Sequence, residues 1–317
     1  MLNIKVTALA ESHCLTPKNL PETCYLFSYF VDNGQDGLRL AWSRDGLKWQ
    51  ALKHGESFLQ PKVGREKIMR DPCIAQGPAG TFHMVWTDSW ESQTIGYASS
   101  KDLLTWSEQR DLAVMKDEPA AKNCWAPEIV YDAEQKGFII FWASTIPGRF
   151  PETEFGGKND HNHRIYGTAT RDFKTFTPTK LFFDPGFNCI DATILPLHGK
   201  FFMFFKDENK LPSPMKNLRL AVADRISGPY LLQADPINPP GSWVEGPSAL
   251  QVGDTTYLYF DAYTKGCYSA LRSRDLKTWE DVTPQLDFPK GTRHGTAFPV
   301  KSGILKRLLD DDNKPGR

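Results

Sequence analysis

Five ionisable residues recur along the chain at similar spacing, and each stands directly before a short apolar run. They are Asp71, Glu128, Asp191, Glu245 and His294, at intervals of 57, 63, 54 and 49 residues. One such residue alone says little, because an isolated Asp-Pro such as 71–72 is usually a turn. Several carboxylates brought into one site could work as general acid and general base. The regular spacing therefore points to a fold that repeats with the same period.

A second repeat indicates what that fold is. The segment 43–49, SRDGLKW, recurs as SKDLLTW at 100–106, TRDFKTF at 170–176 and SRDLKTW at 273–279, with a degenerate copy at 223–230. The repeated aspartate suits a tight turn, in which its side chain accepts hydrogen bonds from the next backbone N–H groups. The aromatic residue that follows can pack between neighbouring units. We assign these residues structural roles and no catalysis.

Short apolar and alternating runs precede the copies and predict β-strands. Examples are 25–30, 38–42, 201–205 and 218–222, bounded by Gly, Asp and Pro turns. No long stretch has helical periodicity. A period near 50 residues with about four strands per unit is typical of propeller blades. Five copies therefore predict an all-β protein, a five-bladed β-propeller.

The repeat count predicts a single catalytic domain over 1–317. Its first blade, at about 20–60, would be closed by a strand from 293–300 at the other end of the chain. A pair of β-sandwiches is the alternative fold. In a propeller the innermost strand of each blade lines the central channel, and the starts of these strands converge on one mouth. The five ionisable residues stand at those starts, so we expect them to face one another.

The order of these motifs resembles glycoside hydrolase family 43. The motifs are Asp-Pro at 71, Trp-Ala-Pro at 125, a strand-opening Asp at 191, Glu-Gly-Pro at 245 and His-Gly at 294, within about 65–300. The resemblance implies a five-bladed propeller with α-L-arabinofuranosidase, β-xylosidase, arabinanase or galactanase activity and inversion at the anomeric carbon. It also implies that Asp71 is the general base, Asp191 the pKa modulator and Glu245 the general acid.

Elementary acid–base chemistry fits these implied roles. Cleavage of a glycoside needs one carboxyl group that is still protonated near neutral pH and one ionised carboxylate that activates water. Two carboxyl groups with equal pKa values would do neither job well, and a neighbouring carboxylate helps an acid to keep its proton. This is a sufficient reason for Asp191 to accompany Asp71 and Glu245.

Three features depart from the family pattern. A whole blade, at about 20–60, precedes Asp71, so the last blade of the family would here be built mainly from the N-terminus. The second aspartate stands in Asp191-Ala192-Thr193, where Asp-Pro-Ser or Asp-Ala-Ser is usual. Glu128, directly after Trp-Ala-Pro, adds a fourth carboxylate near the mouth.

Aromatic residues near the motifs are candidates for sugar platforms, because flat apolar faces stack on sugar rings. Trp90, Trp125, Phe187 and Trp243 are the predicted substrate-binding aromatics, and Trp86 also lies near a motif. Core packing is an equally common role for each of them.

Polar residues complete the predicted substrate-binding set. It contains Glu128, Arg293 and His294, and Arg70 could likewise bond sugar hydroxyls or hold a carboxylate. The resemblance places His294 near a central metal ion or water cluster, which leaves a structural calcium ion open, while no cofactor is expected to be required. The histidines in the polar stretch 156–163 are interpreted as loop residues that could edge the site.

Bulk composition bears on partners and location. Lys plus Arg and Asp plus Glu both number 38, so the chain lacks the basic excess typical of nucleic-acid binding. No apolar run reaches the roughly 18 residues that span a membrane. The segment 1–15 makes a poor signal peptide, which leaves two alternatives: a cytoplasmic location, or a periplasmic or secreted one if a signal peptide has been removed. The six cysteines lack metal spacing and are expected to be free thiols, and the protein to be a monomer.

The predicted function is an inverting glycoside hydrolase that releases L-arabinofuranose from plant polysaccharide side chains or oligosaccharides. Within the family, a β-xylosidase or a galactofuranose-releasing enzyme is the alternative, because the motifs do not separate these substrates. The alternative of another class is a non-catalytic carbohydrate-binding propeller. Such a protein does not need both an Asp-Pro base and a Glu-Gly-Pro acid at equivalent positions of its blades. A protein-interaction propeller of the WD type would show Gly-His and Trp-Asp repeats, which this sequence lacks.

Overall fold

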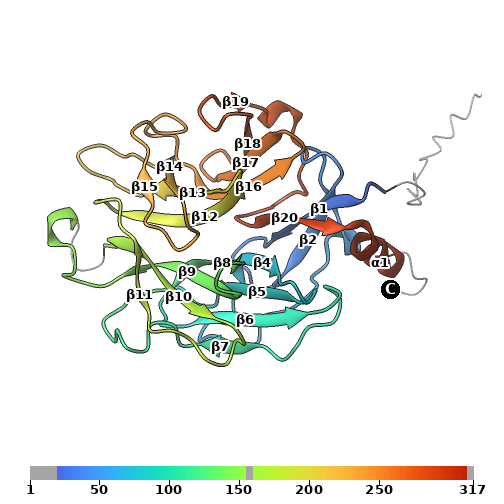
Figure 1. Ribbon diagram of the computed structural model, residues 1–317, viewed down its shortest axis with the longest axis horizontal. Coiled ribbons are helices and arrows are strands. Elements are labelled where there is room, and N and C mark those ends of the chain that lie inside the picture. The colour runs from blue at the N-terminus through green and yellow to red at the C-terminus, as the bar shows by residue number, and fades with distance from the viewer. Residues whose placement is uncertain (1–19, 155–159, 313–317) are drawn as a thin grey trace, which may run out of the picture.

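A computed structural model describes residues 20–154 and 160–312. Within these ranges twenty strands form five four-stranded antiparallel sheets, arranged as blades around a central axis (Figure 1). The prediction of an all-β, five-bladed β-propeller is confirmed. The segment 1–15 that was considered as a signal peptide, together with Cys14, lies outside the described residues.

The strands of each blade run from the channel outwards in the following order. The first blade has β20 (Thr296–Lys301), β1 (Thr23–Tyr29), β2 (Arg39–Ser43) and β3 (Gln50–Ala51). The second has β4 (Arg70–Gln76), β5 (Phe82–Thr87), β6 (Ile95–Ser100) and β7 (Arg110–Leu112). The third has β8 (Trp125–Asp132), β9 (Gly137–Thr145), β10 (His163–Thr170) and β11 (Lys180–Phe183). The fourth has β12 (Cys189–Leu197), β13 (Lys200–Asp207), β14 (Asn217–Ala223) and β15 (Leu231–Leu232). The fifth has β16 (Glu245–Val252), β17 (Thr255–Ala262), β18 (Cys267–Ser273) and β19 (Glu280–Asp281).

The first blade joins the two ends of the described chain. Its innermost strand, β20, pairs antiparallel with β1 in a register that runs from Thr23 opposite Lys301 to Ser28 opposite Thr296. The ring is therefore closed by backbone hydrogen bonds between segments nearly 270 residues apart, as the pairing of Ser28 with Thr296 shows. This closure brings the residues before β20, including His294, to the same mouth as the starts of the other innermost strands.

Five hydrophobic clusters fill the spaces between neighbouring blades. Aromatic side chains dominate the fully buried residues, with Trp86 and Trp142 the largest. Gly96 allows Trp86 to pack in the blade, because a Cβ atom on Gly96 would lie 1.9 Å from Cε2 of Trp86. Trp86 is 0% exposed, so the expectation that it could serve as a sugar platform is wrong.

The predicted aspartate turns form in four of the blades. Asp45 Oδ1 accepts hydrogen bonds from the backbone N–H groups of Leu47 and Lys48 at 2.8 and 2.9 Å. The equivalent turns occur at Asp102, Asp172 and Asp275. The degenerate copy differs, since Asp224 forms an exposed ion pair with Lys200 instead.

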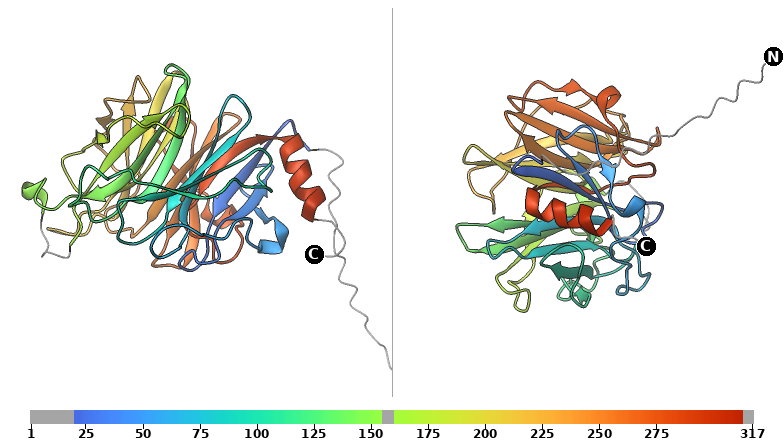
Figure 2. Two further views of the ribbon diagram at one scale, coloured as in Figure 1. Left: turned by 90° about the horizontal axis from the view of Figure 1, so that it is seen from below. Right: turned by 90° about the vertical axis from the view of Figure 1, so that its right-hand side faces the viewer.

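The chain also contains a helix that the sequence analysis did not expect. Helix α1 (Ser302–Asp312) follows β20 and packs against β20 and β1 of the first blade (Figures 1 and 2). It buries Leu305 and Leu308 in the cluster between the first and second blades. Its 11 residues make about three turns, which is short for a periodicity signal and explains why the pattern was missed.

Three single 3₁₀ turns complete the secondary structure: η1 (Lys53–Gly55), η2 (Pro151–Thr153) and η3 (Thr283–Gln285). The one α-helix in residues 20–154 and 160–312 is too short and polar to span a bilayer. The five cysteines within these ranges, Cys24, Cys73, Cys124, Cys189 and Cys267, are free thiols, as expected.

Candidate active site

Four of the five innermost strands carry a β-bulge at the end that faces the mouth. The pairing registers of β4, β8, β12 and β16 with their neighbours all shift within the first few residues. A residue with positive φ lies in each bulge: Asp71 at 52°, Ala126 at 46°, Asp191 at 55° and Gly246 at 59°. A bulge re-aims nearby side chains, and Pro fits there because it has no N–H to donate to the ladder. The Asp-Pro, Ala-Pro and Gly-Pro motifs thus mark the positions of these bulges in the sequence.

Asp71 and His294 form a buried ion pair at the mouth. His294 Nδ1 lies 3.3 Å from Oδ1 of Asp71, and the Thr87 hydroxyl donates to Oδ2 at 2.8 Å. Burial opposes ionisation of Asp71, but the His294 charge and these hydrogen bonds outweigh it and lower the pKa of Asp71 to about 2. Burial likewise disfavours the His294 imidazolium, yet Asp71 raises the pKa of His294 to about 9. At neutral pH the pair is therefore a carboxylate and an imidazolium.

Asp191 has the opposite electrostatic environment. Its side chain is buried, and Oδ2 accepts a hydrogen bond from the backbone N–H of Gly246 at 3.0 Å. Burial raises the pKa of Asp191, and the charges of Glu245 and Asp71 add to the rise, while His294 and Lys206 oppose it. The two predicted catalytic aspartates thus have pKa values that are shifted apart, which suits different roles in one reaction.

Glu245 lies between two cations. Arg293 Nη2 is 3.2 Å from Oε1 of Glu245, and Lys206 Nζ is 3.3 Å from Oε2. The sequence analysis allowed for Arg293 to hold a carboxylate, but the motifs did not reveal Lys206.

His294 also connects the base side of the site with the acid side. The blades follow one another around the ring, so the first blade lies between the second, which carries Asp71, and the fifth, which carries Glu245. A Cβ atom on Gly246 would lie 2.4 Å from Cγ of His294. Glycine is therefore required at 246 for the close approach of the imidazole, and it also adopts the positive φ of the bulge without strain.

Glu128 lies deeper in the channel than the other carboxylates. It stands two residues beyond the bulge residue Ala126, whereas Asp71 and Asp191 occupy their bulges. Its oxygens accept hydrogen bonds from the hydroxyls of Thr193 at 2.8 Å and Thr296 at 3.4 Å. Burial raises the pKa of Glu128 to about 7 against these bonds. The structure thus places Glu128 in the channel but one pleat away from Asp71, Asp191 and Glu245.

The predicted aromatic residues take different positions. Trp90 and Trp243 are 40% and 39% exposed, and Trp125 is half-buried with its ring edge-on to Trp90 at 5.7 Å. Trp125 Nε1 donates to the Trp90 backbone carbonyl at 2.7 Å. Phe187 is half-buried against Phe205. Trp90, Trp125 and Trp243 thus keep surface available for a ligand.

The histidines of the segment 156–163 and Arg70, which the sequence analysis placed near the site, take the following positions. The histidine at 163 begins β10 and is buried, so its interpretation as a loop residue is wrong, and it lies with His161 against the Trp125 ring. The guanidinium of Arg70 lies 4.7 Å from the Phe30 ring centre and 4.4 Å from that of Trp90.

Three residues of the site were missed by the sequence analysis, and one shared sequence feature could have identified them. Thr87, Lys206 and Asp261 all stand at or next to the end of the second strand of their blade, directly after an apolar run. That strand runs antiparallel to the innermost one, so its end lies beside the start of the innermost strand at the same mouth. A polar residue that ends such a run is therefore a candidate for the site.

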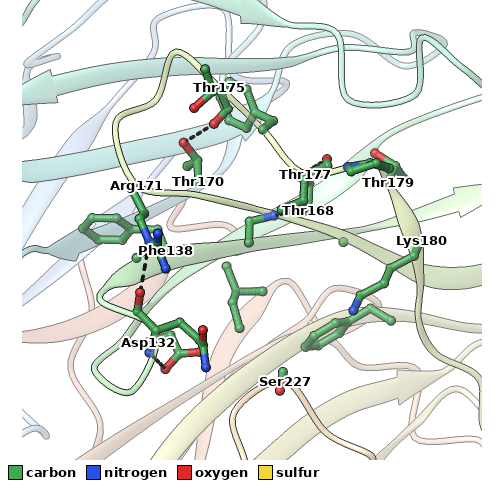
Figure 3. A pocket seen from close by; sticks show the side chains of 18 residues that line it. Asp132, Phe138, Thr168, Thr170, Arg171, Thr175, Thr177, Thr179, Lys180 and Ser227 are labelled. Carbon is green, nitrogen blue, oxygen red and sulfur yellow. Dashed lines mark hydrogen bonds between the residues drawn. The ribbon is translucent and has the colours of Figure 1, made fainter.

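A second hollow lies at the opposite end of the third blade. Figure 3 shows this groove of about 800 Å³, which contains none of the predicted site residues. Its polar side chains are bonded to their own backbone: Thr170 Oγ1 donates to the Thr175 carbonyl at 2.7 Å, and Arg171 Nε to the Gln135 carbonyl at 3.2 Å. The groove has no pair of carboxylates, so we place the candidate active site at the mouth. In the described part of the chain, no group of three or more His, Cys, Asp or Glu residues is arranged to hold a metal ion.

Comparison with protein families decides the class of the protein. The model of the Glyco_hydro_43_rel family, described as a probable glycosyl hydrolase domain, matches residues 21–303. The chain belongs to this family. The match spans all five blades, and the resemblance to glycoside hydrolase family 43 is confirmed. The five blades thus form a glycosyl hydrolase domain of the family 43-related type.

One curated relative is an α-L-arabinofuranosidase of Bifidobacterium longum subsp. longum. It is 25% identical over 217 residues, which cover 59% of this chain and 20% of the relative. The chain thus spans about a fifth of the length of the relative that it matches.

Solved structures share the fold. An α-L-arabinofuranosidase from Lactobacillus brevis superposes with a TM-score of 0.52 at 18% identity, covering 68% of this chain and 72% of that one. A thermostable family-43 glycoside hydrolase gives 0.55 at 16% identity, with 71% and 78% covered. An exo-β-1,3-galactanase from Clostridium thermocellum gives 0.50 at 14% identity, with 70% and 50% covered. At these identities the likeness concerns the fold alone, and the substrate of the family 43-type hydrolase is a separate question.

Proposed function

We propose that this glycoside hydrolase releases L-arabinofuranose from polysaccharide side chains or oligosaccharides with inversion of configuration. Asp71 is the general base that activates water, Glu245 is the general acid that protonates the leaving oxygen, and Asp191 modulates the acid. The three side chains come from the second, fifth and fourth blades and meet at one mouth.

The Asp71–His294 pair is the observation that carries this proposal. A base must be ionised at working pH and able to hold a water molecule, and the imidazolium and the Thr87 hydroxyl keep Asp71 ionised in a buried site. A binding module gains nothing from a buried carboxylate of this kind, because burying a charge is costly unless it performs a task. Asp191 with its raised pKa beside Glu245 is the environment that an acid partner needs.

The preference for an arabinofuranosyl substrate rests on the relatives. An α-L-arabinofuranosidase is found both among the sequence relatives and among the structural neighbours. The exo-β-1,3-galactanase neighbour makes a galactosyl substrate the competing choice. Both substrate types share the requirement for a base and an acid at one mouth, so pocket shape at the sugar ring distinguishes them.

Digestion of defined polysaccharides tests the proposal. The purified protein is incubated with arabinan, arabinoxylan, arabinogalactan and β-1,3-galactan, and released sugars are identified by anion-exchange chromatography. Nitrophenyl α-L-arabinofuranoside, β-xyloside and β-galactoside provide a matched panel of small substrates. We expect arabinose as the main product. Release of galactose without arabinose would contradict the substrate assignment and leave the reaction class intact.

A matched pair of variants tests the catalytic assignment. Asp71→Asn keeps the shape of the side chain but removes the base, and we expect a loss of at least about a hundredfold in kcat. Asp45→Asn makes the same change at an aspartate turn of the first blade and should leave kcat unchanged. Equal activity of the two variants would remove Asp71 from the mechanism.

A further inference from the structure

Six charged side chains alternate in sign across the fourth and fifth blades at the mouth. In order they are Lys216, Glu208, Lys206, Glu245, Arg293 and Asp261. Lys206 Nζ is 2.8 Å from Oε2 of Glu208, and Arg293 Nε is 2.5 Å from Oδ2 of Asp261. Glu245 stands inside this row, with one cation facing each of its two oxygens.

The two cations beside Glu245 differ in how firmly they are held. The Lys206 side chain is 3% exposed, lies near the end of β13 and has its ammonium 5.0 Å from the ring centre of Tyr263. Arg293 is 31% exposed, and its closer partner is Asp261. Each cation thus has a closer carboxylate partner than Glu245, Glu208 for Lys206 and Asp261 for Arg293. The two differ in burial: Lys206 is enclosed by the protein, whereas Arg293 is accessible to a ligand.

We propose that Lys206 is a positioning residue that anchors Oε2 of Glu245 and leaves Oε1 to face the leaving-group oxygen. The inference deepens the proposed function, in which Glu245 is the general acid. An acid must hold its proton within hydrogen-bond reach of the glycosidic oxygen. The anchored Oε2 fixes the rotation of the carboxyl group, so the other oxygen has one orientation and the barrier includes less reorganisation.

Variants at Lys206 test this positioning role. Lys206→Met removes the anchor, and Lys206→Arg keeps the charge with another shape. Lys200→Met is the matched control, because Lys200 lies on the same strand and its ion pair with Asp224 is exposed at the other end. Each variant is assayed on an arabino-oligosaccharide, whose leaving group needs a proton, and on a dinitrophenyl arabinoside, whose leaving group does not. If the wild type releases another sugar, the corresponding pair of substrates with that sugar is used.

We expect Lys206→Met to lose at least about tenfold more kcat on the oligosaccharide than on the aryl glycoside. Lys206→Arg should recover part of the activity on the oligosaccharide, and Lys200→Met should match the wild type. Equal losses on both substrates would overturn the inference. If Lys206→Met does not fold, Lys206→Gln should show the same difference between the two substrates, and equal losses there would overturn the inference too. A wild type that cleaves no glycoside would refute the proposed function itself, whereas an active wild type with insensitive Lys206 variants refutes the inference alone.

Discussion

Replacement of His294 by alanine should disable the proposed base without touching it. The change removes the imidazolium whose Nδ1 lies 3.3 Å from Oδ1 of Asp71. With His294 present, the pKa of Asp71 is lowered from 3.8 to about 2 in spite of burial. A shift of that size corresponds to roughly 2.5 kcal/mol in favour of the carboxylate. Without His294, burial acts against only Thr87 and the more distant Arg70, so we expect the pKa of Asp71 to rise by about two units or more.

The pH dependence of kcat/KM on an aryl glycoside measures this shift. The acid limb of kcat/KM reports ionisation of the base in the free enzyme. For the wild type, the fall in kcat/KM that protonation of Asp71 causes should lie near the lower end of the accessible pH range. For His294→Ala, it should move upwards by about two pH units or more. Thr87→Val, which removes only a hydrogen bond to Asp71, should move the limb in the same direction by less.

Stability provides a second readout with a defined sign. The pKa of His294 is raised from 6.5 to about 9, so its contribution to stability is complete below pH 6.5 and is lost as pH rises through about 9. The wild-type Tm should therefore fall between pH 7 and about 9, and His294→Ala should lack this fall. An acid limb of His294→Ala that coincides with the wild-type limb would refute the assignment of Asp71 and His294 as a functional pair.

Three further predictions concern the other carboxylates. Glu245→Gln should nearly abolish release of sugar from polysaccharide but cost much less with a dinitrophenyl glycoside; equal losses would show that Glu245 is not the acid. The first-formed sugar should have the anomeric configuration opposite to that of the substrate, as early proton NMR spectra report, and retained configuration or a covalent sugar on Asp71 would make Asp71 a nucleophile. The pKa of buried Glu128 is raised from 4.5 to about 7, so its favourable contribution is present below pH 4.5 and is lost as pH rises through 7. At pH 8 Glu128→Gln should therefore be more stable than the wild type by up to about 3 kcal/mol in the free energy of unfolding, with a correspondingly higher Tm, whereas at pH 4 the two should have the same Tm. A difference in Tm that stays constant between pH 4 and pH 8 would argue against this.

The number and kind of blades could be predicted from the sequence because they depend on local chemistry. The Asp45 turn is made within four residues by a side chain that bonds the next backbone N–H groups, so its spacing reports the blade period directly. Strands such as β13 carry their own signal in a continuous apolar run. The start of each innermost strand follows from the same period, which put forward Asp71, Glu128, Asp191, Glu245 and His294. The resemblance to the family then singled out Asp71, Asp191 and Glu245.

The tertiary structure decided how those residues are used. The sequence places Glu128 in phase with Asp71, but the bulges set the side-chain level in the channel, and Glu128 comes two residues after its bulge. The cations beside Glu245 come from β13 and from the segment before β20, at distances in sequence that no local pattern encodes. Charge state depends on such long-range neighbours and on burial. The sequence by itself therefore determined that Asp71, Asp191 and Glu245 stand at the starts of innermost strands. Only the packing of the blades decided that Asp71 faces an imidazolium, that Asp191 is buried with a raised pKa, and that Glu245 is held between Lys206 and Arg293.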